Sequence, residues 1–395
     1  MRDAVIVAAL RTPIGSFGGQ FKDVSAVSLG SEVVKAIIKS VNLAPDQIDE
    51  VIIGNVISSG LGQNVARQVA IKAGIPIEVP SYTINKVCGS GLKAVSLAAQ
   101  AIMVGESDVV IAGGTENMSQ APFLASTARF GSKLGNQTLV DSMLQDALLD
   151  AFSGEHMGVT AENVAKKYQI TRLVQDQLAV ASQERASKAI EAGRFDTEIC
   201  PIKVSNRKGD TQLVNKDEYP RPQTTLEKLS QLRPVFQKDG TVTAGNASGI
   251  NDGAAAVIVM SRDKAAELGL KPLVVIKGSA SAGVAPDFMG CGPIASTKKL
   301  LERLNMTIDG IDLIESNEAF AALSVCVNEA LGFDPTKVNV NGGAIALGHP
   351  VGASGTRILV TLIHELLKQE EHHTGLATLC IGGGQGMSMV VEKVE

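Results

Sequence analysis

The sequence alternates short apolar runs with longer segments in which apolar residues recur every three or four positions. The short runs are rich in Val, Ile and Ala, and several are apolar on both faces, which is typical of strands covered by helices on each side. Among the longer segments, residues 92–104 place Leu92, Val95, Ala99 and Ile102 on one face, and Gly105 ends the predicted helix. The pattern predicts an α/β protein. The predicted strands are residues 4–10, 50–53, 108–112, 254–260, 273–276, 313–315 and 377–381.

A weak internal repeat indicates that the chain contains two similar halves. Residues 88–102 and 352–366 each begin with a glycine- and serine-rich turn, CGSG and GASG respectively, and continue as an amphipathic helix. Residues 108–114 and 377–383 then supply a strand that ends in paired glycines. Either two βα units resemble each other by chance, or the fold is a duplication in which equivalent strand ends meet at one centre.

The middle of the chain differs from both halves. It carries a proline and charge cluster at residues 218–222 and predicted amphipathic helices at 161–168 and 173–190. We interpret it as an insertion over the sheet ends, a placement that favours ligand binding. The predicted division is an N-terminal half of residues 1–118 and 243–270, an inserted loop domain of residues 119–242, and a C-terminal half of residues 271–395.

Composition narrows the class of protein and its compartment. The 395 residues carry a formal charge of −5, without the basic excess of nucleic-acid-binding proteins. The first apolar run is too short for a signal peptide, and no uninterrupted apolar stretch approaches the ~18 residues of a membrane span. The five cysteines are odd in number and form no Cys-x-x-Cys pair. We therefore expect reduced thiols, a cytoplasmic location, and no nucleic-acid or membrane partner.

Cys88 is the first candidate for chemistry. It precedes a predicted helix within a Cys-Gly-Ser-Gly turn, where free N–H groups and the helix dipole stabilise a thiolate. Gly89 and Gly91 are expected to keep the approach to its sulfur open. The alternative is that Cys88 is simply a small buried apolar residue.

His349 and Cys380 are the second and third candidates. His349 lies between Gly348 and Pro350 in a glycine-rich loop, which suits an imidazole that approaches a substrate and activates a thiol. Cys380 ends a predicted strand, and residues 382–384 that follow are glycines whose N–H groups could bind an oxyanion. Nucleotide-loop patterns are not matched, and the spacing argues against a metal site.

Asn317 follows the predicted strand at residues 313–315. Its amide could hold a water or donate to an oxyanion, or it could cap the helix that follows. The spacing alone does not decide between these roles.

Together these segments resemble the signature set of the thiolase family. The matching motifs are CGSG at 88–91, NEAF at 317–320, GGAIALGHPVGASG at 342–355 and CIGGGQG at 380–386. Further matches at residues 11–19, 112–122, 156–163 and 245–256 extend the resemblance essentially from end to end. It implies a five-layer α-β-α-β-α fold built from two similar halves, and the HMG and TAEN segments at 156–163 are similar to short-chain members.

The resemblance also implies roles for the candidate residues. Cys88 would be the nucleophile that takes the acetyl group, and His349 would activate it. His349 would also form one oxyanion hole with a water held by Asn317. Cys380 would remove a proton from the second acetyl-CoA, and the N–H groups of Cys88 and Gly382 would form the second oxyanion hole.

The implied reaction is acetyl-CoA C-acetyltransferase, the reversible condensation of two acetyl-CoA into acetoacetyl-CoA and CoA. The expected partners are these substrates and further copies of the chain in a homodimer or homotetramer, with no cofactor and no metal. Arg221 could stack on adenine, meet phosphate, or be a surface cation. The implied CoA-binding residues are Leu148, His156, Met157, Arg221, Phe236, Ser248, Met289, Ala319 and Phe320.

Several departures leave the length of the acyl chain open. Leu134 stands where short-chain members often carry Met, and Cys291 follows Met289 and Gly290. The main alternative is therefore a longer-chain 3-ketoacyl-CoA thiolase of fatty-acid breakdown. A carrier-protein synthase normally pairs its cysteine with two histidines, whereas the third residue here is Cys380. A non-catalytic acyl-CoA-binding protein is disfavoured because all four chemical positions are present.

Overall fold

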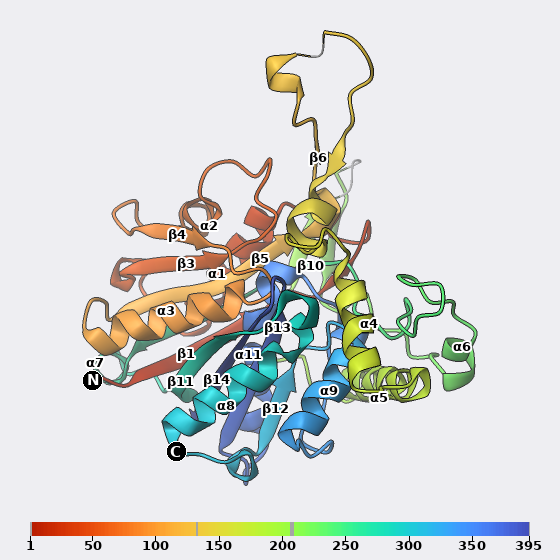
Figure 1. Ribbon diagram of the computed structural model, residues 1–395. Helices are drawn as coiled ribbons and strands as arrows, with labels where there is room; N and C mark the ends of the chain where they lie inside the picture. Colours follow the sequence, from red (N-terminus) through yellow and green to blue (C-terminus); the bar gives the residue numbers. More distant parts are fainter. Residues whose placement is uncertain (1, 132, 206–208, 395) are drawn as a thin grey trace.

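The computed structural model describes residues 2–131, 133–205 and 209–394, and ten of its strands form one sheet, nine of them along a continuous hydrogen-bonded path. All seven predicted strands are present (Figure 1). The first half of the path contains β4 (Ser81–Ile84), β3 (Glu50–Gly54), β5 (Val109–Asn117), β10 (Asn251–Ser261) and β1 (Ala4–Arg11), with β2 (Gly15–Ser16) beside β10. The second half contains β11 (Val274–Gly283), β14 (Gln385–Lys393), β13 (Thr374–Ile381) and β12 (Leu313–Ser316).

The two halves have the same strand order and directions, as a duplication requires. In the first half β3 runs parallel to β5, and β5, β10 and β1 are successively antiparallel. In the second half β12 runs parallel to β13, and β13, β14 and β11 are successively antiparallel. The halves join where β1 pairs with β11, at Val5 with Val275 and at Ile6 with Val274.

Helices cover the outer faces of the two half-sheets and also lie between them, which gives five layers. One outer layer is α1 (Ala26–Ser40) and α2 (Val65–Ala73), and the other contains α8 (Gly292–Leu304) and α9 (Ala321–Leu331). The central layer is α3 (Ser90–Val104) and α11 (Val351–Lys368), which share one apolar core with the inner faces of both half-sheets (Figure 1). The predicted α-β-α-β-α architecture is confirmed.

Glycines allow the central layer to pack closely. A Cβ on Gly91 would lie 2.6 Å from Thr356 Oγ1, and a Cβ on Gly114 would lie 2.1 Å from the carbonyl oxygen of Gly352. Gly91 therefore sets the approach of α3 to α11. The expectation that Gly91 clears the path to the Cys88 sulfur was wrong, because the side of Gly91 where a Cβ would stand faces α11.

The window Val87–Val104 is apolar and long enough, by composition, to cross a membrane. It includes all of α3, and its Ser, Lys and Gln residues interrupt the apolar run although the mean hydropathy stays at 1.5, so no uninterrupted apolar stretch marks it in the sequence. The buried face of α3 belongs to the central apolar core, so its hydropathy is that of a core helix.

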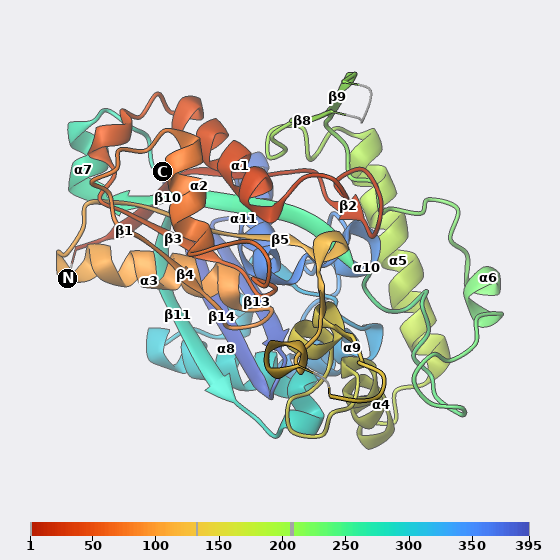
Figure 2. The same cartoon turned by 90° about the horizontal axis from the view of Figure 1, so that it is seen from above.

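The segment between β5 and β10 contains the predicted insertion. Its hairpin of β6 (Phe123–Leu124) and β7 (Val140–Asp141) stands away from the body in Figure 1, whereas Figure 2 shows α5 and α6 along one side. The other elements of this segment are α4 (Met157–Lys167), α5 (Arg172–Glu191), β8 (Ile202–Ser205), β9 (Thr211–Val214) and α6 (Leu226–Ser230). Among the described residues, the remaining α-helices are α7 (Arg262–Glu267) and α10 (Ala344–Leu347).

Candidate active site

A cavity of about 370 Å³ opens where the strand ends of both halves meet α4 and the loop before β10. It brings together most of the residues that the sequence analysis singled out, from segments hundreds of positions apart. Those that line it are Cys88, Leu148, His156, Met157, Phe236, Ser248, Met289, Ala319, Phe320, His349, Cys380 and Gly382.

Cys88 sits in a strained turn between β4 and α3. The preceding Val87 has φ +47°, a left-handed conformation that is unfavourable for a β-branched residue. Neighbouring side chains hold the turn: Asn85 Oδ1 accepts the Val87 N–H at 2.9 Å, and Ser90 Oγ accepts the Lys86 N–H at 2.8 Å. The same Ser90 hydroxyl donates to the Val87 carbonyl at 2.7 Å. Strain held in this way is typical of functional sites.

Two backbone N–H groups, those of Cys88 itself and of Gly382, bond to the Cys88 sulfur. They lower its pKa, but burial outweighs them and raises the pKa of the thiol to about 11. The N–H groups at the helix terminus thus favour the thiolate as expected, but two donors do not replace the lost hydration, so the resting thiol keeps its proton. The same two N–H groups converge on the place where charge develops during attack on a Cys88 thioester.

The Ser354 hydroxyl holds the His349 imidazole at Nδ1. Its oxygen lies 2.5 Å from Nδ1 and within 2.9 Å of the Pro350 carbonyl, to which it can donate its single hydrogen. In that arrangement Ser354 Oγ accepts from Nδ1–H, which leaves Nε2 with a lone pair. Burial, together with the positive charge of Arg357, lowers the pKa of His349 to about 4. The neutral ring can act as a base.

Cys380 ends β13, with 3% of its surface exposed. Burial raises the pKa of its thiol well above the usual range, and the nearby Cys88 adds to the effect. The glycine turn follows directly, and Gly383 and Gly384 adopt φ of +79° and +82°. This left-handed path, which glycine adopts without strain, carries the chain into β14 close behind the Gly382 N–H.

Asn317 is buried behind the cavity and does not line it. Both polar atoms of its side chain lack a hydrogen-bond partner among the described residues. The capping interpretation was wrong, because α9 begins after Phe320 and has no side-chain cap. Buried amides are normally paired, so an unpaired one beside a reactive cavity points to a polar ligand or a bound water.

Aromatic rings form one wall of the cavity. His156 stacks on Phe236 with ring centroids 4.5 Å apart, and Phe236 meets Phe320 edge to face at 6.1 Å. Gly158 makes this packing possible, because a Cβ there would lie 2.2 Å from the Phe236 ring. The Ser248 N–H donates to the Ala319 carbonyl at 3.0 Å and fixes the loop before β10.

Arg221 lies outside this cavity, in an adjoining one of about 310 Å³. Its backbone N–H donates to Gln183 Oε1 at 2.8 Å, and its guanidinium lies 5.6 Å from the Tyr219 ring centre. Tyr219 and Ala244 line both cavities, so the two spaces are neighbours. An elongated ligand could extend from the cysteines to Arg221.

Sequence reasoning missed part of the lining and one supporting group. Tyr219 could have been found, because it neighbours Arg221 in the proline cluster, and Ser354 lies within the motif that contains His349. The other missed residues are mostly small or apolar and carry no separate signal. They are Met118, Ala147, Val235, Thr243, Ala244, Ala247, Gly249, Ile250 and Val351. Over the described parts of the chain, no group of three or more His, Cys, Asp and Glu side chains could hold a metal ion.

Comparisons with known proteins agree with this geometry. Residues 4–263 match the family model for the thiolase N-terminal domain, and residues 270–393 match that for the C-terminal domain. Proteins named probable acetyl-CoA acyltransferase, from Staphylococcus epidermidis and Staphylococcus aureus, are 56% identical over the whole of both chains. The chain therefore belongs to the thiolase family, and it is an acyltransferase.

Two solved structures have the same fold over the whole chain. The Bacillus anthracis acetyl-CoA acetyltransferase is 45% identical with a TM-score of 0.97, and human mitochondrial 3-ketoacyl-CoA thiolase is 44% identical with a TM-score of 0.96. Each comparison covers 100% of this chain and 99% of the other. The nearly equal likeness leaves the length of the acyl chain to be argued from the cavity.

Proposed function

We propose that the protein is an acetyl-CoA C-acetyltransferase that reversibly condenses two acetyl-CoA into acetoacetyl-CoA and CoA. The observation that carries the proposal is the convergence of two thiols and one neutral imidazole on a cavity with two N–H groups at the Cys88 sulfur. Condensation of two thioesters needs both an acyl acceptor and a base for the methyl proton, and Cys88 and Cys380 supply these two functions.

In the first half-reaction, His349 Nε2 takes the Cys88 proton as the sulfur attacks the acetyl-CoA carbonyl carbon. Burial raises the pKa of Cys88 and lowers that of His349, so forming a thiolate–imidazolium pair before the sulfur meets the carbonyl carbon is costly. Proton transfer must therefore accompany attack, with attraction between the ions and oxyanion stabilisation offsetting this cost. The C–S bond to CoA then breaks, CoA leaves as a thiol with the proton of Cys380, and acetyl-Cys88, a Cys380 thiolate and protonated His349 remain.

In the second half-reaction, the Cys380 thiolate removes a methyl proton from a second acetyl-CoA. The carbanion attacks the carbonyl of acetyl-Cys88, a C–C bond forms, the C–S bond to Cys88 breaks, and His349 returns its proton to the Cys88 sulfur. The N–H groups of Cys88 and Gly382 lie where the oxyanion of this step would form. A water held by the unpaired amide of Asn317, with His349, would bind the enolate oxygen.

The shape of the cavity supports a short acyl group. Its volume of about 370 Å³ is near the small end of the ~300–1,000 Å³ range of ligand sites, and the pantetheine arm must share it. Met289, buried to 3% exposure, lines the cavity with Met157 and Cys380. The longer-chain 3-ketoacyl-CoA thiolase remains the second candidate, because the lining is mostly apolar and the human neighbour carries that name.

Acetyl labelling tests the two roles of the cysteines. Incubated with acetyl-CoA, the protein should gain one acetyl group on Cys88, measured by intact mass and peptide mapping. Cys88→Ala should lose labelling and turnover but remain folded, whereas Cys380→Ala should still be labelled yet fail to condense. Failure to label Cys88 in the folded wild-type protein would overturn the mechanism.

Rates of CoA-dependent cleavage test the acyl length. Acetoacetyl-CoA should be cleaved with a higher kcat/KM than a ten-carbon 3-ketoacyl-CoA. In the Met289→Ala variant the kcat/KM values for the two substrates should lie closer together, because the substitution removes side-chain volume from the cavity wall. Faster cleavage of the ten-carbon substrate by the wild-type protein would establish the longer-chain alternative instead.

A further inference from the structure

Two cysteines that the proposed reaction does not use meet beside the active site. Cys291 directly precedes α8 and is half-buried, and Cys326 lies in α9 with 2% of its surface exposed. Cys291 packs against the apolar cluster that contains Cys326, and the two thiols are hydrogen-bonding neighbours in it. Both are free thiols in the structure, so the pair is a dithiol contributed by two different elements.

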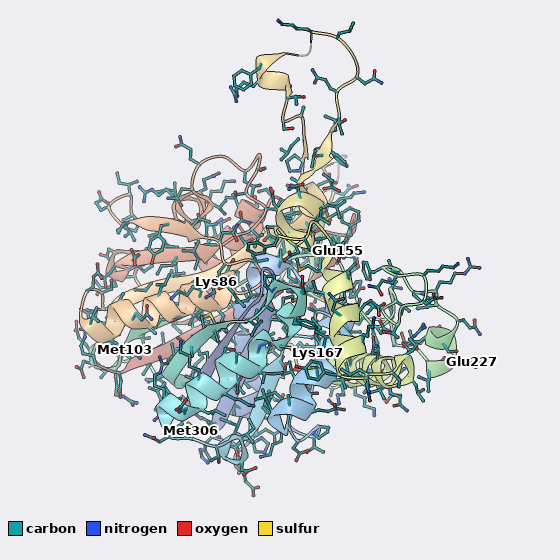
Figure 3. The ribbon with its side chains drawn as sticks, viewed as in Figure 1. Lys86, Met103, Glu155, Lys167, Glu227 and Met306 are labelled. Atoms are coloured by element: carbon teal, nitrogen blue, oxygen red, sulfur yellow. The ribbon has the colours of Figure 1, made fainter. Side chains whose placement is uncertain are left out.

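Basic and polar groups from the end of α4 face this dithiol. Tyr168 Oη lies 3.6 Å from the Cys291 sulfur, and Lys167 Nζ lies 4.2 Å from the centre of the Phe288 ring. Lys167 is labelled in Figure 3, near the end of α4. Glu329 faces the pair from α9, so the positive charge of Lys167 has one acidic neighbour there.

These contacts shift the pKa values of the two thiols in opposite directions. The hydrogen bond from Cys326 lowers the pKa of Cys291, and Tyr168 and the charge of Lys167 lower it further, while burial opposes them. Cys326 keeps its proton, because it donates to Cys291 and is itself buried. An accessible thiolate beside a protonated thiol is the arrangement of a reactive cysteine with a resolving partner.

We propose that Cys291 is a peroxide-reactive modification site and that Cys326 resolves it to an intramolecular disulfide. The Cys291 thiolate attacks one oxygen of hydrogen peroxide, the O–O bond breaks, and the products are Cys291 sulfenic acid and hydroxide. The Cys326 sulfur then attacks the sulfenic sulfur, its proton and the departing hydroxide leave as water, and an S–S bond forms. Each sulfur is oxidised by one electron, and the peroxide is reduced to water.

The position of the pair connects this chemistry to the cavity. Met289 and Cys291 belong to the same short 3-10 segment (Pro286–Cys291), and Phe320 directly precedes α9. A disulfide between Cys291 and Cys326 would thus tie together two elements that both supply cavity wall. Cys200 provides a contrast, because burial raises its pKa to about 11 and its sulfur faces carbonyl oxygens of Glu32 and Pro201.

The test treats the reduced wild-type protein with hydrogen peroxide at neutral pH, blocks the remaining thiols, and maps the peptides without reduction. The expected result is a Cys291–Cys326 linked peptide that dithiothreitol removes, with Cys200 still alkylated. In Cys326→Ser, dimedone should trap the Cys291 sulfenic acid, which should escape trapping in the wild-type protein. Cys200→Ser is the matched control and should form the linked peptide at the wild-type rate.

A variant that leaves both cysteines in place adds an independent measurement. Lys167→Gln should slow Cys291 oxidation at least threefold, because it removes the cation that favours the thiolate. Two results would overturn the proposal. The first is a linked peptide that joins only Cys88 and Cys380 while Cys291 stays alkylated, and the second is an oxidised Cys291 that never links to Cys326.

Discussion

The hydroxyl of Ser354 offers the sharpest test of the proposed base. It accepts from His349 Nδ1–H at 2.5 Å, and Ser354→Ala removes this acceptor from a residue only 1% exposed. An unpaired buried donor costs about 1–3 kcal/mol, and the ring avoids that cost by moving its proton to Nε2. Nε2 then cannot accept the Cys88 proton. We expect the rate of Cys88 acetylation to fall roughly 5- to 150-fold, the range to which that energy corresponds.

The assay is the rate of acetyl-Cys88 formation after rapid mixing with acetyl-CoA, measured by intact mass. Ser296→Ala is a matched control, since the Ser296 hydroxyl is also buried, donates to a carbonyl three residues earlier and bonds to a second side chain, Ser388. Both variants should lose about 1 kcal/mol of unfolding free energy in urea.

Only Ser354→Ala should lower the rate of Cys88 acetylation. The reasoning about the tautomer is refuted if Ser354→Ala acetylates Cys88 within twofold of the wild-type rate. It is equally refuted if Ser296→Ala slows acetylation as much, because the effect would then be a general consequence of lost stability.

Two further predictions concern stability, and urea unfolding measures both. Gly91→Ala should lower the free energy of unfolding by about 1–3 kcal/mol, because its Cβ would lie 2.6 Å from Thr356 Oγ1. Gly310→Ala, where the added Cβ meets open space, should leave that free energy almost unchanged, and equal effects of the two substitutions would contradict the packing argument. Burial and Arg357 hold the pKa of His349 at about 4, below the unfolded value near 6.5, so its contribution to stability is complete above pH 6.5 and is lost as pH falls toward 4. His349→Asn should therefore remove about 2 kcal/mol of the stability difference between pH 7 and pH 5, and an unchanged difference would show that the folded histidine titrates normally.

The sequence predicted seven strands of the main sheet but not the short β2 and β4 or the long β14. Its run from Gln385 to Lys393 contains Ser388, which is fully buried and breaks the apolar pattern. The Ser388 hydroxyl is satisfied by Ser296, Thr297 and Thr378. A buried hydroxyl is acceptable in a core only when such partners are present, and they come from segments about 90 and 10 residues away. Local patterning cannot reveal that arrangement.

The chemical groups of the site were easier to predict than their electrostatics. Cys88, His349 and Cys380 stand among glycines, and Cys88 and Cys380 line one cavity, as the repeat indicated. The state of the Cys88 thiol could not be predicted, because it depends on how much water the folded chain excludes. The left-handed φ of Val87 was equally hidden, since no local residue requires it and tertiary packing must hold it.

The insertion leaves the sheet and returns to it at neighbouring positions. Asn117, the last residue of β5, pairs with Asp252 near the start of β10. In the second half, a glycine turn makes the equivalent connection from β13 to β14. Because loop-closure entropy grows slowly with length, the inserted segment can be lengthened, shortened or rewritten at little cost to the sheet. Evolution can thus change which thioester is admitted while the thiols, imidazole and N–H groups beneath it keep their geometry.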